Sequence, residues 1–392
     1  MVELYGRILT RRDLAERSGA LSQFAGVRLM TLGDGVERGI RVLEFRTGTG
    51  LRFTALVDRA LDIGDCEIRG QAIGWHSPSG FRHPGLHEPE GEAGLGWLRS
   101  FSGLLVTGGL DHILGPAEVS AETYHYPGRS SVRHGLHGRL SAIPARLSGY
   151  GERWEDERCV LWAEGVMQQS TVFGEDLHLH RRIEADVGGS EIRITDRVEN
   201  HGFARTPHML FYHVNLGYPL LDKGARFAAP IRYVVWASHA GPDYRRQAVG
   251  YRRMPDPRPD FREQVWQHDL AADDQGWTSA ALINDRLGLG FEIRTRKAQL
   301  PCTYEWQNFQ SGHYTIGIEP STHHVLGDAA ARERGEMIWL EHGDERHYDA
   351  VFRLVDGAEA IAQFDTRVTS LGSQPDEDYP APSNDFPNLS HR

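Results

Sequence analysis

Cysteine is scarce in this chain of 392 residues, which contains only Cys66, Cys159 and Cys302. The three residues lie far apart and form no CxxC pair, so the sequence offers no disulfide framework and fits a reducing compartment. Long hydrophobic runs are also missing, because no apolar stretch approaches the roughly 20 residues of a membrane-spanning helix. Residues 1–20 are too charged for a secretory signal. These absences predict a cytoplasmic protein with no membrane partner.

Positive charge is in deficit too, since 43 Lys and Arg face 54 Asp and Glu and give a formal net charge of −11. Nucleic-acid-binding proteins present a clustered positive surface, which this sequence lacks, so we expect no nucleic-acid partner. The chain also has no GxSxG, GxGxxG or Walker motif. We therefore do not expect hydride transfer, phosphoryl transfer or serine-nucleophile chemistry of the kinds that use those motifs.

Glycine, by contrast, is abundant at 44 residues, and it separates many short runs in which apolar and polar residues alternate. Such alternation is typical of half-buried strands bounded by turns. The clearest runs are 41–47, 52–58, 159–167, 177–185, 191–200, 208–217, 289–296, 314–320 and 349–356. One early helix is expected from the N-cap Thr10 to Gly19. The pattern predicts an all-β fold, a large antiparallel β-sandwich with few short helices.

The chain divides on composition into three parts. Residues 1–24 read as an N-terminal extension with the short helix, and residues 25–371 read as one sandwich domain. Residues 372–392 are rich in Pro, Asp and Ser, which predicts an unstructured tail. Within the domain, residues 77–100 and 238–278 read as long loops, and loops of that length are usually functional or disordered.

The stretch YTIGIEP, residues 314–320, places a carboxylate on an unusually small strand face. Thr315, Gly317 and Glu319 share one face of the predicted strand. Pro320 lacks an N–H group and should end the strand. A ligand lying flat on the sheet beside the Glu319 carboxylate would explain both the charge and the cleared surface.

The strand predicted at residues 208–217 has a similar character. Phe211, His213, Asn215 and Gly217 share one face, while Leu210 and its alternate neighbours form the core face. A buried structural histidine is one interpretation of His213. The parallel with the Glu319 strand favours a functional one.

Two further segments are candidates for ligand binding. In RHGLHGRLS, residues 133–141, Arg139 can fork onto hydroxyls or a carboxylate and His137 can donate to a hydroxyl. A solvated basic turn explains this segment equally well. Arg59 follows a buried strand between Asp58 and Asp62, where a surface ion pair is the alternative interpretation.

Histidines at ligand-like spacings raise the question of a metal. The relevant pairs are His134 with His137, His178 with His180, and His323 with His324. Strand positions two apart produce HxH by chance in a histidine-rich chain, and no HExxH or CxxC motif accompanies them. We therefore expect no metal.

Taken in order, Arg59 and the segments LHGRLS, ITDRVENHG, LFYHVNLGYPLLD and GIEPSTH resemble the aldose 1-epimerase (galactose mutarotase-like) superfamily. The chain is most similar to the branch of uncharacterised bacterial mutarotase-related proteins that is described as a domain of unknown function. The resemblance extends from about residue 25 to 370. It implies a large antiparallel β-sandwich and a reaction that interconverts the α and β anomers of a free sugar without a cofactor.

The resemblance also implies roles for individual residues. Glu319 corresponds to the general base that takes the anomeric hydroxyl proton, and His213 to the general acid that protonates the ring oxygen. His137 corresponds to a substrate-binding histidine and Arg59 to a binding arginine. The further residues that we assign to substrate binding are Arg139, Asp222, Asn215 and Trp306.

Departures from the superfamily pattern leave the sugar open. Galactose-specific members have a serine or threonine and an aromatic residue where this chain has HVNLGYP, and they differ after the glutamate, where it has PSTHH. Arg59, Arg133 and Arg139 leave room for an anionic group on the substrate. Two other readings remain: an isomerase or lyase for a keto sugar or uronate, with a metal at the histidines, and a non-catalytic carbohydrate-binding module. The expected partner is a small carbohydrate, and a homodimer is left open.

Overall fold

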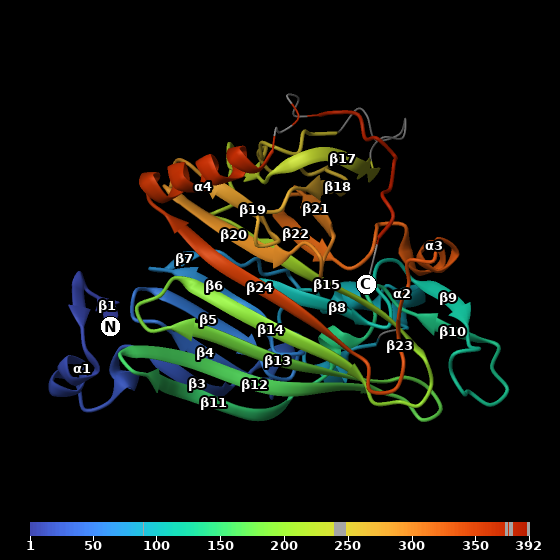
Figure 1. The fold of residues 1–392 in the computed structure, drawn as a ribbon, viewed down its shortest axis with the longest axis horizontal. Coiled ribbons are helices and arrows are strands. Elements are labelled where there is room, and N and C mark those ends of the chain that lie inside the picture. Colours follow the sequence, from blue (N-terminus) through green and yellow to red (C-terminus); the bar gives the residue numbers. More distant parts are fainter. Residues whose placement is uncertain (89, 239–247, 373–374, 376–378, 390–392) are drawn as a thin grey trace.

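The structure is a computed structural model that describes residues 1–88, 90–238, 248–372, 375 and 379–389 (Figure 1). Its largest sheet has eight antiparallel strands. In spatial order these are β11 (Arg146–Glu155), β12 (Arg158–Ser170), β13 (Asp176–Asp186), β14 (Glu191–Asn200), β24 (Glu345–Asp356), β20 (Leu289–Arg296), β19 (Trp277–Asn284) and β16 (Arg226–Ala228). The predicted alternation is confirmed here: along β13, for example, every second residue is buried.

A five-stranded sheet lies behind the β11–β14 half of this sheet (Figure 1). Its strands are β3 (Gly26–Thr31), β4 (Arg41–Arg46), β5 (Leu51–Leu56), β6 (Asp62–Ile68) and β7 (Gln71–Ala72). Phe45 and Phe53 from this sheet and Leu161 and Ile183 from the larger one belong to the same buried cluster. The apolar faces of the two sheets therefore form one core, as sheet-on-sheet packing requires.

A third sheet carries the two strands that the sequence singled out. Its order is β17 (Ile231–Ala237), β18 (Gln264–Leu270), β21 (Cys302–Asn308), β22 (Thr315–Ser321), β15 (Thr206–Leu216) and β23 (Ile338–Leu340), and β8 (Leu105–Leu110) also pairs with β15. Every residue of β15 is buried, because one face joins the core and the other is covered by loops. The antiparallel β-sandwich predicted from the sequence is confirmed.

Helices are few and short among the described residues. They are α1 (Arg11–Arg17), α2 (Gly91–Gly94), α3 (Gly327–Glu333) and α4 (Ala358–Leu371), and the remaining strands form two small hairpins, β1 (Val2–Leu4) with β2 (Arg7–Leu9) and β9 (Ala117–Ser120) with β10 (Ser131–His134). The predicted early helix is confirmed, since Thr10 and Asp13 form a reciprocal capping box at the start of α1. None of the described helices is long and apolar enough to cross a membrane.

Three expectations differ from the structure. Pro320 does not end β22, because the strand continues to Ser321 and Pro320 pairs opposite Thr303. The segment 238–278 is not one loop, since it contains β18 and the start of β19, although residues 239–247 lie outside the described part.

The third difference concerns the tail predicted to be unstructured. Residues 379–389 of that tail are described, and they run along the third sheet (Figure 1). The Ser383 and Asn384 N–H groups donate to the carbonyls of Val234 and Val235 in β17. Edge strands offer unpaired backbone groups, and this edge binds the tail. Residues 373–374, 376–378 and 390–392 lie outside the described part.

Candidate functional site

Glu319 and His213 lie side by side on adjacent strands. Val214 of β15 pairs with Ile318 of β22 in antiparallel register, which places His213 opposite Glu319. The distance from His213 Nε2 to Glu319 Oε1 is 3.1 Å. Each residue is 4% exposed. The two titratable side chains that the sequence placed on separate polar strand faces therefore share one face of one sheet.

Gly317 explains how the pair fits. A Cβ at position 317 would lie 2.6 Å from Glu319 Oε1 and 2.9 Å from His213 Cε1, closer than real Cβ contacts allow. The small face noted in the sequence is therefore filled by the His213 and Glu319 side chains themselves. The sequence interpretation, in which a ligand lies flat on this part of the sheet, is wrong in that detail.

An aromatic shell covers the pair. Ring centroids of the neighbours lie 4.7–6.0 Å from that of His213. In order of distance they belong to Phe101, Trp306, Phe211, Trp97 and His137. Rings of this kind pack against apolar surfaces and strengthen electrostatic interactions beside them by excluding water.

Burial shifts both members of the pair toward their neutral forms. It lowers the pKa of His213 to about 3, and hydrogen bonding with Asn215 raises this pKa only a little in return. Burial raises the pKa of Glu319 well above its usual value, and the carboxylate of Glu263 adds to the effect. Because charge is disfavoured on both groups, the pair holds a single proton over a wide pH range.

The long loop after β7 supplies two of the covering rings. Trp97 lies in a short 3₁₀ turn, Gly96–Arg99, and its indole N–H donates to Ser141 Oγ at 3.1 Å. Phe101 follows immediately and lies 4.7 Å from His213, between ring centroids. Residues 77–100 therefore bring part of the enclosure to the site, as a functional loop would.

Arg59 holds this loop from below and is not a surface ion pair. Its side chain is buried and its Nη2 donates to the Ser100 carbonyl at 2.5 Å, one residue before Phe101. Burial lowers the pKa of Arg59 to about 10. Asp58, its sequence neighbour, instead pairs with Arg41. Arg59 thus positions the loop, because its hydrogen bonds go to the Arg82 and Ser100 carbonyls and not to His213 or Glu319.

His137 does reach the site, whereas Arg139 does not. The His137 ring packs on Trp97 at 4.5 Å and on Phe211 at 4.7 Å, and its backbone takes a positive φ of 58°. Arg139 Nη1 instead lies 3.3 Å from Glu175 and 3.7 Å from Asp111. His137 therefore lies in the aromatic shell, whereas Arg139 lies among carboxylates outside it.

Of the remaining predicted binding residues, some lie at the His213–Glu319 pair and others do not. Trp306 of β21 packs edge-on against His213, and its indole N–H donates to Glu263 at 2.8 Å. Asn215 shares the strand face of His213, but its amide donates to the Gly103 carbonyl at 3.0 Å. Asp222 accepts a hydrogen bond from Arg286 at 2.6 Å in an exposed ion pair. The structure brings Trp306 to the pair and leaves Asp222 outside it.

Sequence reasoning missed three residues of this site. Trp97 and Phe101 lie in a loop without periodicity, so no pattern linked them to His213, although aromatic residues in a long loop were a usable signal. Glu263 is exposed and binds Trp306 at the rim. Its contribution depends on pairing between β18 and β21, which the sequence does not reveal.

Two of the histidine pairs with ligand-like spacing in the sequence, His134 with His137 and His323 with His324, have separate surroundings in the structure. His134 stacks on His112 at 4.8 Å, while His137 lies in the aromatic shell. His323 Nε2 donates to the Glu336 carbonyl, and its Nδ1 lies 2.8 Å from Thr322 Oγ1. His324 Nδ1 lies 2.6 Å from Gln267 Nε2. Neither pair presents two ring nitrogens to one point among the described residues.

The antiparallel sandwich has the galactose mutarotase-like fold, as similar solved structures show. A protein of Klebsiella pneumoniae subsp. pneumoniae MGH 78578, described as a candidate aldose 1-epimerase, is similar with a TM-score of 0.79 and 24% identity over 88% of each chain. A galactose mutarotase-like protein of Clostridium acetobutylicum has a TM-score of 0.56 and 10% identity over 85% of this chain and 99% of its own.

Galactose 1-epimerase of Lactobacillus acidophilus NCFM has a TM-score of 0.52 and 11% identity over 84% of this chain and 99% of its own. These likenesses establish the fold. The chain belongs to the family described as Domain of unknown function (DUF4432), whose model matches residues 37–354. No curated protein matches the sequence.

Proposed function

We propose that the protein is an aldose 1-epimerase that interconverts the anomers of a free sugar by general acid and base catalysis. The observation that carries the proposal is the direct contact between His213 Nε2 and Glu319 Oε1 at 3.1 Å inside an aromatic shell. Ring opening needs a proton removed from one oxygen while another is supplied about one bond away. An imidazole and a carboxyl group that lie side by side meet that need.

The reaction uses the charged tautomer of the pair, in which the shared proton lies on His213. The Glu319 carboxylate takes the proton of the anomeric hydroxyl as the C1–O bond becomes a carbonyl. The C1–O5 bond breaks and its electron pair takes the proton from His213 Nε2. Rotation about C1–C2 presents the other carbonyl face, and the same two transfers in reverse close the ring and restore both groups.

The substrate that these surroundings favour is an uncharged aldose. Arg59 and Arg139, which could have bound an anionic group, are engaged by Ser100 and by two carboxylates respectively. At the rim, Glu263 adds negative charge beside Trp306. The rings of Trp97, Phe101 and Trp306 offer apolar surfaces for the C–H faces of a pyranose.

Access to the pair requires a movement of its cover. His213 and Glu319 are each 4% exposed, and Trp97 and Phe101 above them are 4% and 5% exposed. A sugar therefore reaches the pair when the loop that carries Trp97 and Phe101, or the half-buried Trp306, shifts. Closure over the substrate would then exclude water from the open-chain aldehyde.

The test of the proposal is anomer exchange by Glu319→Gln. Glutamine keeps the size of the side chain but cannot accept the proton, so exchange should slow by roughly 10²–10⁴-fold, or about 3–5 kcal/mol of transition-state stabilisation. NMR exchange spectroscopy across hexoses, pentoses, deoxy sugars and uronates measures the rates and selects the best substrate for the variant.

A matched control is available one strand away. Glu305 of β21 is also fully buried and faces a histidine, His268, at 3.0 Å, but on the core side of the sheet. Glu305→Gln should lower the melting temperature at least as much as Glu319→Gln while exchange stays near the wild-type rate. Normal exchange by folded Glu319→Gln would refute the proposed base.

Solvent exchange separates this reaction from an isomerase or lyase. Mutarotation moves protons only between oxygen and nitrogen, so the recovered sugar should carry no deuterium on carbon after turnover in D₂O. Deuterium at C2 would show proton abstraction from carbon and would replace the proposal with an isomerase that uses the same pair.

A further inference from the structure

We propose that His178, His180 and His201 form a zinc-binding site on the outer face of the eight-stranded sheet, away from the His213–Glu319 pair. Their donor atoms all lie within 4.8 Å of one another. Among the residues that the structure describes, they are the one such group of three or more His, Cys, Asp or Glu side chains. The sequence showed only the HxH pair, and the fold adds the third histidine.

The strand geometry explains why the three meet. Along β13, Leu177 and Leu179 point into the core, so His178 and His180 share the outer face. His178 pairs opposite Glu199 of β14. His201 follows β14 directly, and its N–H donates to the Asp176 carbonyl at 2.8 Å, which returns its side chain to the start of β13.

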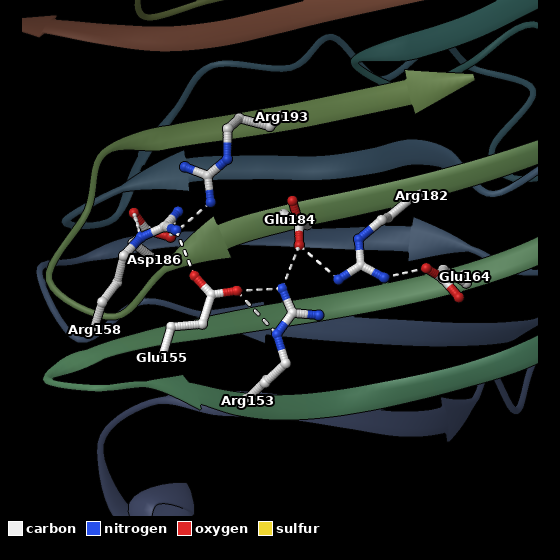
Figure 2. Close-up of polar contacts among 8 residues, drawn as sticks. All are labelled: Arg153, Glu155, Arg158, Glu164, Arg182, Glu184, Asp186 and Arg193. Carbon is white, nitrogen blue, oxygen red and sulfur yellow. Dashed lines mark hydrogen bonds and ion pairs between the residues drawn. The ribbon is translucent and has the colours of Figure 1, made fainter. Parts of the chain in front are cut away.

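The rest of this face has a different composition. From Arg182 onward, the outward positions of β13 and the neighbouring strands carry charges of both signs that form ion pairs (Figure 2). Arg182 contacts Glu164 and Glu184, and Asp186 contacts Arg158 and Arg193. The histidines break this pattern at one end of the same strand, where Arg197 of β14 lies opposite His180 and bonds to Glu199.

The Glu199 carboxylate lies beside two of the three histidines, and His178 Nε2 lies 3.0 Å from Asp176 Oδ1. Glu199 Oε2 lies 3.3 Å from His201 Nε2 and 4.0 Å from His180 Nε2. His180 Nε2 is buried and makes no hydrogen bond to any described residue. The His178 and His201 rings stack with centroids 3.8 Å apart. A buried ring nitrogen without a hydrogen bond is costly unless a ligand binds it.

These donors suit a divalent transition-metal ion, and zinc above all. Zinc binds imidazole nitrogen at about 2.0–2.1 Å in tetrahedral geometry, which sets ligand atoms about 3.3 Å apart. The three nitrogens therefore need to close by at most about 1.5 Å, within the reach of side-chain rotation. Glu199, which lies beside His180 and His201, would supply the fourth donor.

The consequence of binding is structural. An ion held by β13, by Glu199 of β14 and by His201 would tie the β14–β15 turn to the neighbouring strand. Anything that binds only the native state stabilises it in proportion to its concentration and affinity. The site lies outside the proposed acid–base pair, so its metal should raise the melting temperature without changing anomer exchange.

The experiment uses the full chain, purified without a histidine tag, stripped with EDTA and dialysed. Isothermal titration with Zn²⁺ should give one site per chain, and Co²⁺ should produce the visible absorption of a four-coordinate ion. The melting temperature should rise with added Zn²⁺. The stripped protein should retain the anomer exchange of the untreated protein, which separates this site from a catalytic metal.

Three variants locate the site. His180→Ala and His201→Ala should each weaken Zn²⁺ binding by at least about 10–100-fold, the loss usual for an outer partner of a metal ligand. His347→Ala is the matched control, because His347 is half-exposed and faces the single carboxylate Glu345 at 2.8 Å. It should bind Zn²⁺ as the parent does. Unchanged binding by His180→Ala and His201→Ala, or no binding by the parent chain, would overturn the assignment.

Discussion

Burial acts on His213 and Glu319 in opposite directions, and this governs the pH range of the proposed reaction. For solvated side chains, with pKa values of about 6.5 and 4.3, the pair would hold one proton only between those values. Burial lowers the pKa of His213 to about 3 and raises that of Glu319 well above its usual value. A second proton is therefore added only near pH 3, and the last is lost only at a pH well above 4.3.

We therefore expect exchange to be nearly independent of pH where a solvated pair would titrate. Between pH 4 and 5 the rate constant should change by less than about twofold, because His213 takes up a proton only near pH 3 and burial raises the pKa of Glu319 well above its usual value. NMR exchange at a series of pH values, corrected for spontaneous mutarotation, measures this. A change in rate centred near pH 4.3 would show that Glu319 titrates as a solvated carboxyl group does.

At the scale of elements, the site depends on how β22 and the loop after β7 approach β15. A Cβ at position 317 would displace the ends of the Glu319 and His213 side chains, so glycine there lets both lie close against the sheet. The loop must be fixed from below for Trp97 and Phe101 to cover them. Both requirements concern the backbone and can be tested without altering the pair.

Gly317→Ala should slow anomer exchange although the His213 and Glu319 side chains are both still present. Its Cβ would overlap Glu319 Oε1 and His213 Cε1, and overpacking of this kind costs about 1–3 kcal/mol of folding free energy. Displacing the pair by about 1 Å should slow exchange by about 100-fold. Gly33→Ala is the control, since no atom lies within 4 Å of its added Cβ. Full activity in folded Gly317→Ala would mean that the pair tolerates displacement.

Arg59→Met should loosen the loop. The variant leaves the Ser100 carbonyl without its buried donor, so Trp97 and Phe101 should lose their fixed positions over His213. We expect exchange to slow by about 10–100-fold and tryptophan fluorescence to shift to longer wavelength.

Arg226→Met is the comparison for Arg59→Met. Arg226 pairs with Asp285 and Asp365 at the edge of the eight-stranded sheet. It should lower the melting temperature but leave both the exchange rate and the emission spectrum unchanged. An equal loss of exchange in both variants would make the effect of Arg59 one of stability alone.

At the scale of the whole molecule, the C-terminal segment closes the far side of the third sheet. His324 Nε2 lies 2.8 Å from the Pro387 carbonyl, and the Leu389 N–H donates to Glu336 at 3.2 Å. Residues 387–389 also line a small pocket of about 180 Å³ beside Cys302. A segment whose composition resembles a disordered tail is thus held by specific backbone hydrogen bonds.

Ending the chain after residue 378 should therefore expose that pocket. The four hydrogen bonds made by the backbone groups of Ser383, Asn384, Pro387 and Leu389 are each worth about 0.5–1.5 kcal/mol, so their loss should lower the free energy of unfolding by about 2–6 kcal/mol. Cys302, now 2% exposed, should react faster with a thiol reagent, while Cys66 and Cys159 in the sandwich core should stay protected. Mass spectrometry of the labelled peptides measures the three rates. Unchanged labelling of Cys302 would show that the tail does not cover it.

The strands could be predicted from the sequence, because alternation with period two is a local signal that each segment carries alone. The same signal placed His213 and Glu319 on the less apolar faces of their strands, and the capping pattern placed Thr10 and Asp13 at the start of α1. Which strands are neighbours could not be predicted and is seen only in the folded chain. The contact of His213 with Glu319, the turn of Arg139 toward Asp111, and the cover provided by Trp97 all join residues distant in sequence. Such contacts depend on how whole sheets and loops pack, and no short stretch of sequence contains that information.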